Sequence, residues 1–187
     1  MTHAPMEIPK ATATRIRLVV LDVDGVLTDG GIYIGAGNGD ETEFKRFDVQ
    51  DGLGIRMMRS AGLHVAIVSG RVSAATDIRA AELGIEDVYQ DAGARKIPVL
   101  EKLLAARGVG WDEVALVGDD LADLPALRRV GLAGTVANGV PEVCRVATWQ
   151  STREGGRGAV REFAEALLHA RGQWDGLVEE YCRARGG

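Results

Sequence analysis

The sequence has few cysteines, few aromatic residues and no long apolar run. Its two cysteines, Cys144 and Cys182, are far apart and outside any Cys-x-x-Cys pair, so neither a disulfide framework nor a zinc site is expected. Aromatic residues make up 5% of the chain, whereas hydrophobic residues make up 46%. The core must therefore consist mainly of Val, Leu, Ile and Ala, as in a parallel sheet covered by helices.

An excess of basic residues is also missing. The chain has 22 Lys and Arg against 27 Asp and Glu, which gives a net charge of −5 and argues against a nucleic-acid partner. Small anionic substrates stay compatible with this balance, because a metal ion and a few local cations can dominate a site. No stretch of about 18 apolar residues predicts a membrane span, and residues 1–15 lack the apolar core of a signal peptide. We expect a cytoplasmic protein with no membrane partner.

Short apolar runs alternate with helical patterns along the chain. Buried strands are predicted at 17–21, 64–68, 88–89 and 113–117, with shorter ones near 135–136 and 146–147. Helices are predicted from 53 to about 61, and over 74–83, 97–106 and 159–170. This alternation predicts an α/β fold with a Rossmann-like open parallel sheet and helices on both faces.

A β-hairpin at about 30–47 is the one predicted interruption of this alternation, with Gly35, Gly37, Asn38 and Gly39 in its turn. The length of 187 residues allows one domain with a full core and is too short for two ordinary ones. We therefore expect a single domain over residues 16–172. A loose tail at 1–15 and a second tail at 173–187 would flank it.

Polar residues follow the predicted strands, at the edge where ligands bind in open parallel sheets. Those that stand at such strand ends, or begin the helix after the third strand, are Asp22, Asp24, Ser69, Lys96, Asp119 and Asp120. One acidic residue after a strand carries little information. Several strand ends with complementary groups predict a site.

These groups predict phosphoryl transfer with a magnesium cofactor. Asp22 and Asp119 can converge on one hard cation through oxygen ligands, with Asp24 as a further candidate ligand. Asp22 can attack phosphorus to form an aspartyl phosphate. Asp24 can protonate the leaving oxygen and then activate water. Ser69 and Lys96 can hold the phosphoryl oxygens as their charge develops.

Some residues keep two interpretations. Asp119 and Asp120 can each act as a cap of the next helix, since Asp is common before a helix, and Asp119 can instead be a metal ligand. Asp123 can be an acid on a helix surface or a partner of a metal ligand. Arg79 can bind substrate or pair with Glu82, three residues further along a helix.

The motifs Asp22-Val-Asp24-Gly25-Val26, Ser69-Gly70-Arg71, Lys96 and Gly118-Asp-Asp-Leu-Ala-Asp123 resemble those of the haloacid dehalogenase-like hydrolase superfamily. Over roughly residues 16–175 the chain is similar to its phosphatases of 3-deoxy-D-manno-octulosonate 8-phosphate (KDO 8-phosphate). The segments that carry this closer resemblance are 21–30, 47–52, Tyr89-Gln90 and Gly155-Gly-Arg-Gly-Ala-Val-Arg-Glu162. Gln50 departs from the pattern, because an arginine is frequent there, and the loop before Lys96 is about one residue longer than is common.

The resemblance implies a minimal cap that consists of the hairpin, and a homotetramer with the hairpins packed at its centre. It implies that Gly155 to Gly158 closes a neighbour's active site. It also implies a pathway role in lipopolysaccharide precursor biosynthesis. An arginine suits a sugar-acid carboxylate through paired hydrogen bonds. The substrate-binding residues implied are Asp24, Asp48, Val49, Gln50, Asp51, Gly52, Arg56, Arg71, Arg79, Lys96, Gly155, Gly156 and Arg157.

Three other functions stay open at this point. A phosphatase of a nine-carbon sugar acid of the KDN or sialic acid type differs only in substrate. A signalling receiver domain also arranges aspartates, a hydroxyl and a lysine around magnesium, but an acid–base residue such as Asp24 would hasten loss of its phosphoryl group. A non-catalytic assembly module of the same fold would not require the acidic set.

Overall fold

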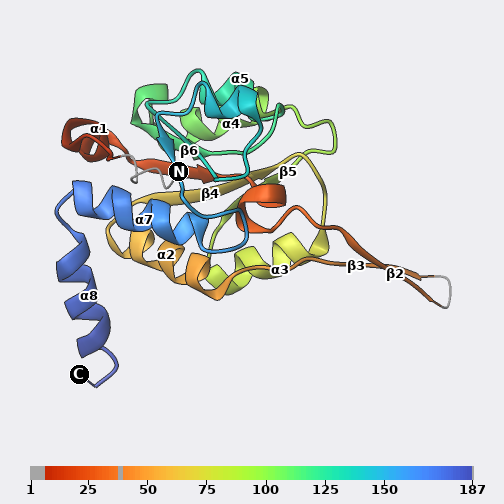
Figure 1. Ribbon diagram of the computed structural model, residues 1–187, viewed down its shortest axis with the longest axis horizontal. Helices are drawn as coiled ribbons and strands as arrows, with labels where there is room; N and C mark the ends of the chain where they lie inside the picture. The colour runs from red at the N-terminus through yellow and green to blue at the C-terminus, as the bar shows by residue number, and fades with distance from the viewer. Residues whose placement is uncertain (1–6, 38–39, 187) are drawn as a thin grey trace.

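A six-stranded parallel sheet forms the centre of the protein (Figure 1). The computed structural model describes residues 7–37 and 40–186. The strands are β1 (Leu18–Leu21), β4 (His64–Ser69), β5 (Asp87–Gln90), β6 (Val114–Val117), β7 (Leu132–Thr135) and β8 (Trp149–Gln150). Their order is β5-β4-β1-β6-β7-β8, so β1 lies between β4 and β6. The predicted α/β fold class is confirmed.

The two faces of the sheet pack against different helices, because side chains along a strand alternate in direction. Val19 and Leu21 face the core formed with α2 (Val49–Ser60), α3 (Ala74–Leu83) and α7 (Ala159–Ala170). Leu18 and Val20 face the core formed with α4 (Lys96–Arg107), α5 (Leu124–Leu127) and α6 (Pro141–Cys144). All four residues of β1 are buried, which explains why this strand is a continuous apolar run.

Most predicted elements appear with small shifts. The helices α3 and α7 have the predicted bounds, and α4 is one residue longer at each end. The helix α2 begins four residues early, since the Asp48 carboxylate caps it by accepting a hydrogen bond from Gln50 N at 2.7 Å. The last strand lies at 149–150 rather than 146–147.

Two terminal helices were not predicted from the sequence, α1 (Lys10–Arg15) and α8 (Trp174–Arg183). The expectation of a loose tail is wrong for residues 10–15, and residues 174–183, expected only as a tail, form a helix. The Arg171 guanidinium donates to the carbonyls of Ala13 and Ile16, which fixes α1 beside α7. Leu177 attaches the start of α8 to the core, while the helix extends away from the body (Figure 1). Residues 1–6 lie outside the described residues, and the domain boundaries stay a prediction.

The predicted hairpin consists of β2 (Tyr33–Gly37) and β3 (Asp40–Phe44), which pair antiparallel with Tyr33 opposite Phe44. It projects from the body beyond the carboxyl ends of the sheet strands (Figure 1). Gly35 and Gly37 lie within β2, whereas Asn38 and Gly39 of the predicted turn lie outside the described residues. The short helical turns η1 (Val23–Leu27) and η2 (Trp111–Glu113) complete the element order.

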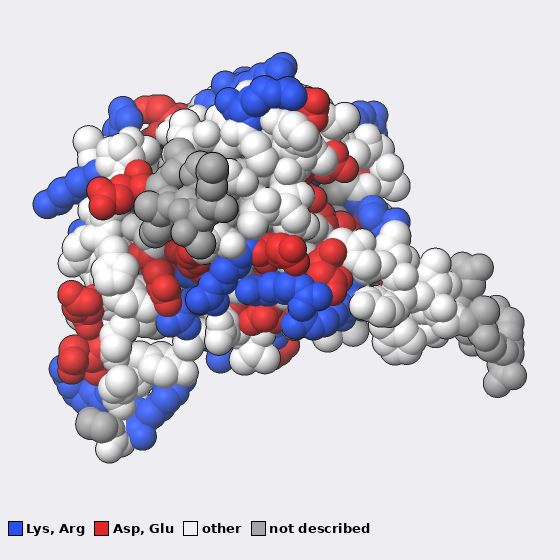
Figure 2. Space-filling view, in the orientation of Figure 1, with Lys and Arg blue, Asp and Glu red and all other residues white. Residues whose placement is uncertain are grey.

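The surface charge, the helices and the cysteines agree with what the composition predicts. Acidic side chains lie among the basic ones on the face shown in Figure 2, without a basic stripe. Within residues 7–37 and 40–186, no helix has the length and apolar character needed to cross a membrane. Cys144 and Cys182 are free thiols.

Leu167 should contribute strongly to the stability of the core on the α7 side, because its side chain is fully buried (0% exposed). We expect Leu167→Ala to lower the free energy of unfolding by about 2–5 kcal/mol, through lost burial and a cavity. Leu121→Ala is the matched control, since Leu121 is 57% exposed, and it should change stability by less than about 0.5 kcal/mol. Urea denaturation measures both. Equal losses would contradict this description of the core.

Candidate active site

The carboxyl ends of β1 and β6 bring a group of acidic side chains together. Asp22 follows β1 directly, and its N–H donates to Val117 O of β6 at 3.1 Å. Asp119 and Asp123 lie in the loop after β6. One carboxylate oxygen from each of Asp22, Asp119 and Asp123 lies within 4.8 Å of the others. The predicted convergence of Asp22 and Asp119 is therefore present, with Asp123 as an additional member.

Lys96 is the cation of this group. It begins α4, is only 5% exposed, and its Nζ lies 2.7 Å from Asp22 Oδ1 and 2.5 Å from Asp123 Oδ1. A buried ammonium is costly unless it is paired and hydrogen-bonded, and these two carboxylates supply both. Burial alone would lower the pKa of Lys96, but Asp22 and Asp123 hold it above its ordinary value. Lys96 therefore stays charged.

One lysine does not balance three carboxylates. Burial, and then the charge of Asp123, raise the pKa of Asp22 to about 6, although Lys96 acts against that rise. Burial and the charges of Asp22 and Asp123 raise the pKa of Asp119 to about 8. Both shifts show that the group holds more negative charge than its surroundings stabilise.

Asp119 Oδ1 is buried and has no hydrogen-bond partner among the described residues. Asp123, by contrast, is satisfied, since its Oδ2 accepts from the N–H groups of Asp119 and Asp120. Asp120 Oδ1 accepts from Leu121 N at 2.7 Å, a local turn contact. Hard oxygen ligands, an orphaned carboxylate oxygen and uncompensated negative charge fit a divalent cation.

Gly25 allows Asp119 to approach this closely. Its φ is +92°, and a Cβ there would overlap the Asp119 carboxylate. A side chain at position 25 would thus be strained by backbone conformation and by space. Buried Thr28 fixes the same turn, because its Oγ1 accepts from the N–H groups of Gly25 and Gly30 and donates to Val23 O.

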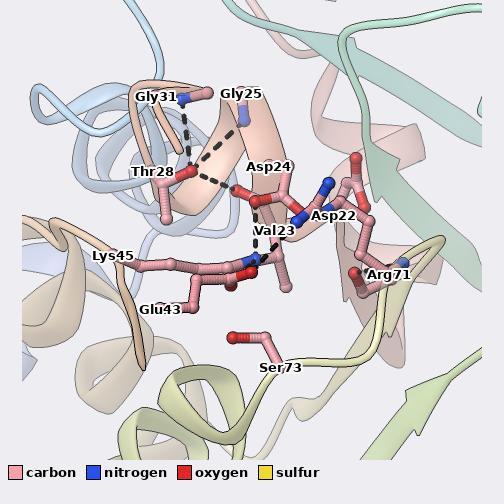
Figure 3. Close-up of polar contacts among 12 residues, drawn as sticks. Asp22, Val23, Asp24, Gly25, Thr28, Gly31, Glu43, Lys45, Arg71 and Ser73 are labelled. Atoms are coloured by element: carbon pink, nitrogen blue, oxygen red, sulfur yellow. Dashed lines mark hydrogen bonds and ion pairs between the residues drawn. The ribbon is translucent and has the colours of Figure 1, made fainter. Parts of the chain in front are cut away.

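The Asp24 carboxylate lies outside the metal-like group. Its Oδ1 is 2.6 Å from Lys45 Nζ, and its Oδ2 is 3.7 Å from Arg71 Nε (Figure 3). The Asp24 carboxylate is not part of the group that could hold a metal ion, so the expected metal role of Asp24 has no support from its side chain. Ser69 ends β4, is 2% exposed, and its Oγ accepts from Arg71 N at 3.1 Å.

The glycine-rich segment packs within its own chain, against the turn that follows Asp22. Gly155 N donates to Asn138 Oδ1 at 3.0 Å, and Gly156 N donates to Val26 O at 2.9 Å. Both glycines are buried, and a Cβ on Gly155 would overlap Gly25 O. Within one chain these contacts hold Gly155 and Gly156 against the turn after Asp22. The expectation that the segment closes a neighbour's site stays a prediction.

Asp51 also serves the fold in this structure. Its side chain is 1% exposed, and its oxygens accept from Arg161 N at 2.8 Å and Gly158 N at 3.4 Å, at the start of α7. Burial raises the pKa of Asp51 to about 6. It thus links α2 to α7 across the sequence, and its predicted contact with substrate has no support in this geometry.

The other predicted substrate residues fall in two places. Arg71 contacts the Asp24 group, whereas Arg56 and Arg79 line a cavity of about 270 Å³ with Val49, Gln50 and Gly52. Neither Asp22 nor Asp119 is among the described residues that line this cavity, so the cavity is separate from the acidic group. Arg79 pairs with Glu82 at 2.8 Å and donates to Asp48 O, as the alternative interpretation expected. Arg157 is exposed and lies 3.6 Å from Glu154.

Sequence reasoning missed Lys45 and Glu43, which stand beside Asp24 at the root of the hairpin (Figure 3). The alternation of Glu43-Phe44-Lys45 was visible in the sequence and places both charged residues on one side of the strand. Only the path of the hairpin shows that this side faces Asp24.

Comparisons with known proteins agree with the site. A family model described as haloacid dehalogenase-like hydrolase matches residues 85–162. 3-Deoxy-D-manno-octulosonate 8-phosphate phosphatase KdsC of Escherichia coli (strain K12) is 44% identical over 165 residues, which is 88% of this chain and 86% of that protein. The chain belongs to the haloacid dehalogenase-like hydrolase family.

Solved structures extend the likeness to the whole fold. The 3-deoxy-D-manno-octulosonate 8-phosphate phosphatase of Moraxella catarrhalis, solved in complex with magnesium, phosphate and KDO, is 39% identical with a TM-score of 0.86. The match covers 92% of this chain and 97% of that one. A probable YrbI family phosphatase from Pseudomonas syringae is 44% identical with a TM-score of 0.86, covering 92% and 96%. The resemblance to this group of phosphatases is confirmed.

The raised pKa of Asp119 predicts how the stability of the metal-free protein depends on pH. The folded state keeps this proton up to about pH 8, whereas the unfolded state releases it near 3.8, so stability falls as pH rises between these values. Between pH 6 and 8, above the pKa of about 6 of Asp22 and Asp51, Asp119 is the main contributor. We expect a fall of up to about 1.4 kcal/mol per pH unit.

Urea denaturation in EDTA across pH 6–8 measures this slope. Asp119→Asn should flatten it, and Asp112→Asn, an exposed change remote from the site, should leave it as in the original chain. An unchanged slope in Asp119→Asn would show that another group titrates.

Proposed function

We propose that this chain is a magnesium-dependent phosphatase that hydrolyses KDO 8-phosphate to KDO and phosphate through an aspartyl phosphate on Asp22. The single observation that carries the proposal is the buried pair of Asp22 and Lys96, next to an Asp119 oxygen that has no hydrogen-bond partner in the part of the chain that the structure describes. The named relatives support the substrate. They do not favour a nine-carbon substrate or an assembly module.

The residues present fit a divalent cation, which Asp22 and Asp119 would hold. Bound magnesium would offset the repulsion between these carboxylates and a phosphate dianion. Asp123 is engaged by Lys96 and two backbone N–H groups, so we assign it the task of orienting its neighbours.

In the first step Asp22 attacks phosphorus, and the bond between phosphorus and the ester oxygen breaks as the bond to Asp22 forms. Asp24 gives its proton to the leaving sugar oxygen. Lys96 has three N–H donors and uses two on Asp22 and Asp123, so one is left for a phosphoryl oxygen. The Ser69 hydroxyl can donate to another.

In the second step a water molecule attacks the phosphorus of the aspartyl phosphate. Asp24, now a carboxylate, accepts a proton from that water, and Asp22 leaves as a free carboxylate. Because Asp24 ends the cycle protonated, the set returns to its starting state. A residue with this role shortens the life of the phosphoenzyme, which distinguishes a phosphatase from a receiver domain.

A homotetramer is part of the proposal, and exposed apolar side chains on the hairpin support it. Tyr33, Ile34 and Phe44 are 52%, 70% and 60% exposed in the single chain. Much of the projecting hairpin visible in Figure 2 carries uncharged atoms. Tyr33 and Phe44 are directly opposite each other in the hairpin, whereas Ile34 lies on its other face. Exposed apolar side chains gathered on one projecting element are typical of a protein interface. The cytoplasmic location and the role in lipopolysaccharide precursor biosynthesis stay predictions.

Asp22→Asn tests the proposed nucleophile, since an amide cannot form the aspartyl phosphate. We expect phosphate release from KDO 8-phosphate with magnesium to fall more than about 1,000-fold, as for other lost nucleophiles. Asp112→Asn is the matched control and should keep full activity. Normal turnover by Asp22→Asn would contradict the mechanism. Equal kcat/KM on a nine-carbon 9-phosphate would contradict the substrate.

Ile34→Glu tests the hairpin as the assembly surface. A charge buried between apolar hairpins is costly, so we expect light scattering to show a species smaller than the tetramer. Leu121→Glu introduces the same charge at another exposed apolar residue and should leave the mass unchanged. A tetramer that survives Ile34→Glu would place the interface elsewhere.

A further inference from the structure

A buried lysine joins the hairpin to the proposed acid–base residue. Lys45 directly follows β3, and only 1% of its side chain is exposed. Its Nζ lies between the carboxylates of Asp24 and Glu43, at 2.6 Å from Asp24 Oδ1 and 3.6 Å from Glu43 Oε1 (Figure 3). A buried ammonium requires paired charges, so these two carboxylates determine where Lys45 can lie.

Arg71 extends the pair into a network of four charges. Its Nη2 lies 3.0 Å from Glu43 Oε2, and its Nε lies 3.7 Å from Asp24 Oδ2. Two cations thus alternate with two carboxylates, and the four come from the loop after β1, the hairpin and the loop after β4. When Asp24 is ionised, as it is after the first step, the network balances its own charge, unlike the group around Asp119.

The two oxygens of Asp24 are not equivalent in this network. Oδ1 accepts the short hydrogen bond from Lys45, whereas Oδ2 lies beyond hydrogen-bond distance from Arg71. One oxygen is therefore held, and the other can exchange a proton with a substrate. Among the described residues, Lys45 donates the one hydrogen bond that the Asp24 carboxylate accepts, so this contact fixes the orientation of the carboxylate.

We infer that Lys45 is a positioning residue for the acid–base carboxylate of Asp24. This inference rests on the proposed function and adds a residue of the hairpin to it. When Asp24 passes its proton to the leaving oxygen and the ester bond breaks, Lys45 keeps its own protons. After the transfer, Lys45 holds the Asp24 carboxylate in the position from which it accepts a proton from the water of the second step. Proton transfer by a positioned group contributes about 100- to 10,000-fold to rate.

The next residue shows that this placement is specific. Arg46 is 46% exposed, lies 4.0 Å from Asp48, and donates to Gly156 O at 2.6 Å, on the side of the glycine-rich segment. Adjacent residues of an extended chain point in opposite directions. Lys45 is therefore the cation of the hairpin that reaches Asp24.

Lys45→Met tests the inference, with Lys102→Met as the control because Lys102 is exposed on α4. The readout is the single-turnover rate of leaving-group release from KDO 8-phosphate and from p-nitrophenyl phosphate. The sugar alkoxide needs a proton to leave, whereas p-nitrophenolate does not. We expect Lys45→Met to slow sugar release by at least about 100-fold and p-nitrophenol release by less than about tenfold. Asp24→Asn should show the same selectivity.

Several outcomes would overturn the inference. Equal slowing on both substrates would show a general structural role for Lys45, and unchanged rates would show none. If Lys45→Met does not fold, Lys45→Gln and Lys45→Arg are measured in its place. Lys45→Arg should stay within about tenfold of the original rate, and Lys45→Gln should show the leaving-group selectivity. Full turnover by Asp22→Asn would instead refute the proposed function.

Discussion

The constraint on which the structure depends is an excess of buried negative charge at one edge of the sheet. Three carboxylates meet there, and Lys96 balances only part of their charge. Burial makes each unpaired charge costly, which is why Asp119 would hold a proton up to about pH 8 without a cation. The same excess would favour binding of a divalent cation at these oxygen ligands. Binding of that cation and stability of the fold are thus coupled at Asp119.

The surrounding backbone is built to hold this charge close together. Gly25 has no side chain, so the turn after Asp22 can lie directly against Asp119. Thr28 secures that turn from inside, and Gly155 covers it from outside. The turn after Asp22, the loop that carries Asp119 and the segment that contains Gly155 are distant in sequence. They come into close contact because Gly25 and Gly155 have no side chains. A side chain added at Gly25 or Gly155, or the loss of the Thr28 hydroxyl, would therefore shift Asp22 relative to Asp119 although no charged residue is replaced.

The sequence predicts the parts of this site that depend on strand ends. Asp22 and Asp119 each follow an apolar run, and parallel strands place such ends on one edge. The partners of Lys45 and Asp51 were not predictable in this way. Lys45 meets Asp24 only because of how the hairpin folds back, and Asp51 caps a helix more than a hundred residues away. The helices α1 and α8 are short, with tertiary contacts such as Arg171 to Ala13, which no local pattern encodes.

The hairpin combines two roles through the alternation of a single strand. Phe44 is exposed on one side, whereas Glu43 and Lys45 face the site on the other. Because neighbouring residues of a strand move together, an interface that fixes Phe44 also fixes the position of Lys45 relative to Asp24. In the proposed mechanism the hairpin therefore supplies one of the two cations around Asp24, the other being Arg71. Assembly through the hairpin would therefore stabilise the proton-transfer geometry as well as the oligomer.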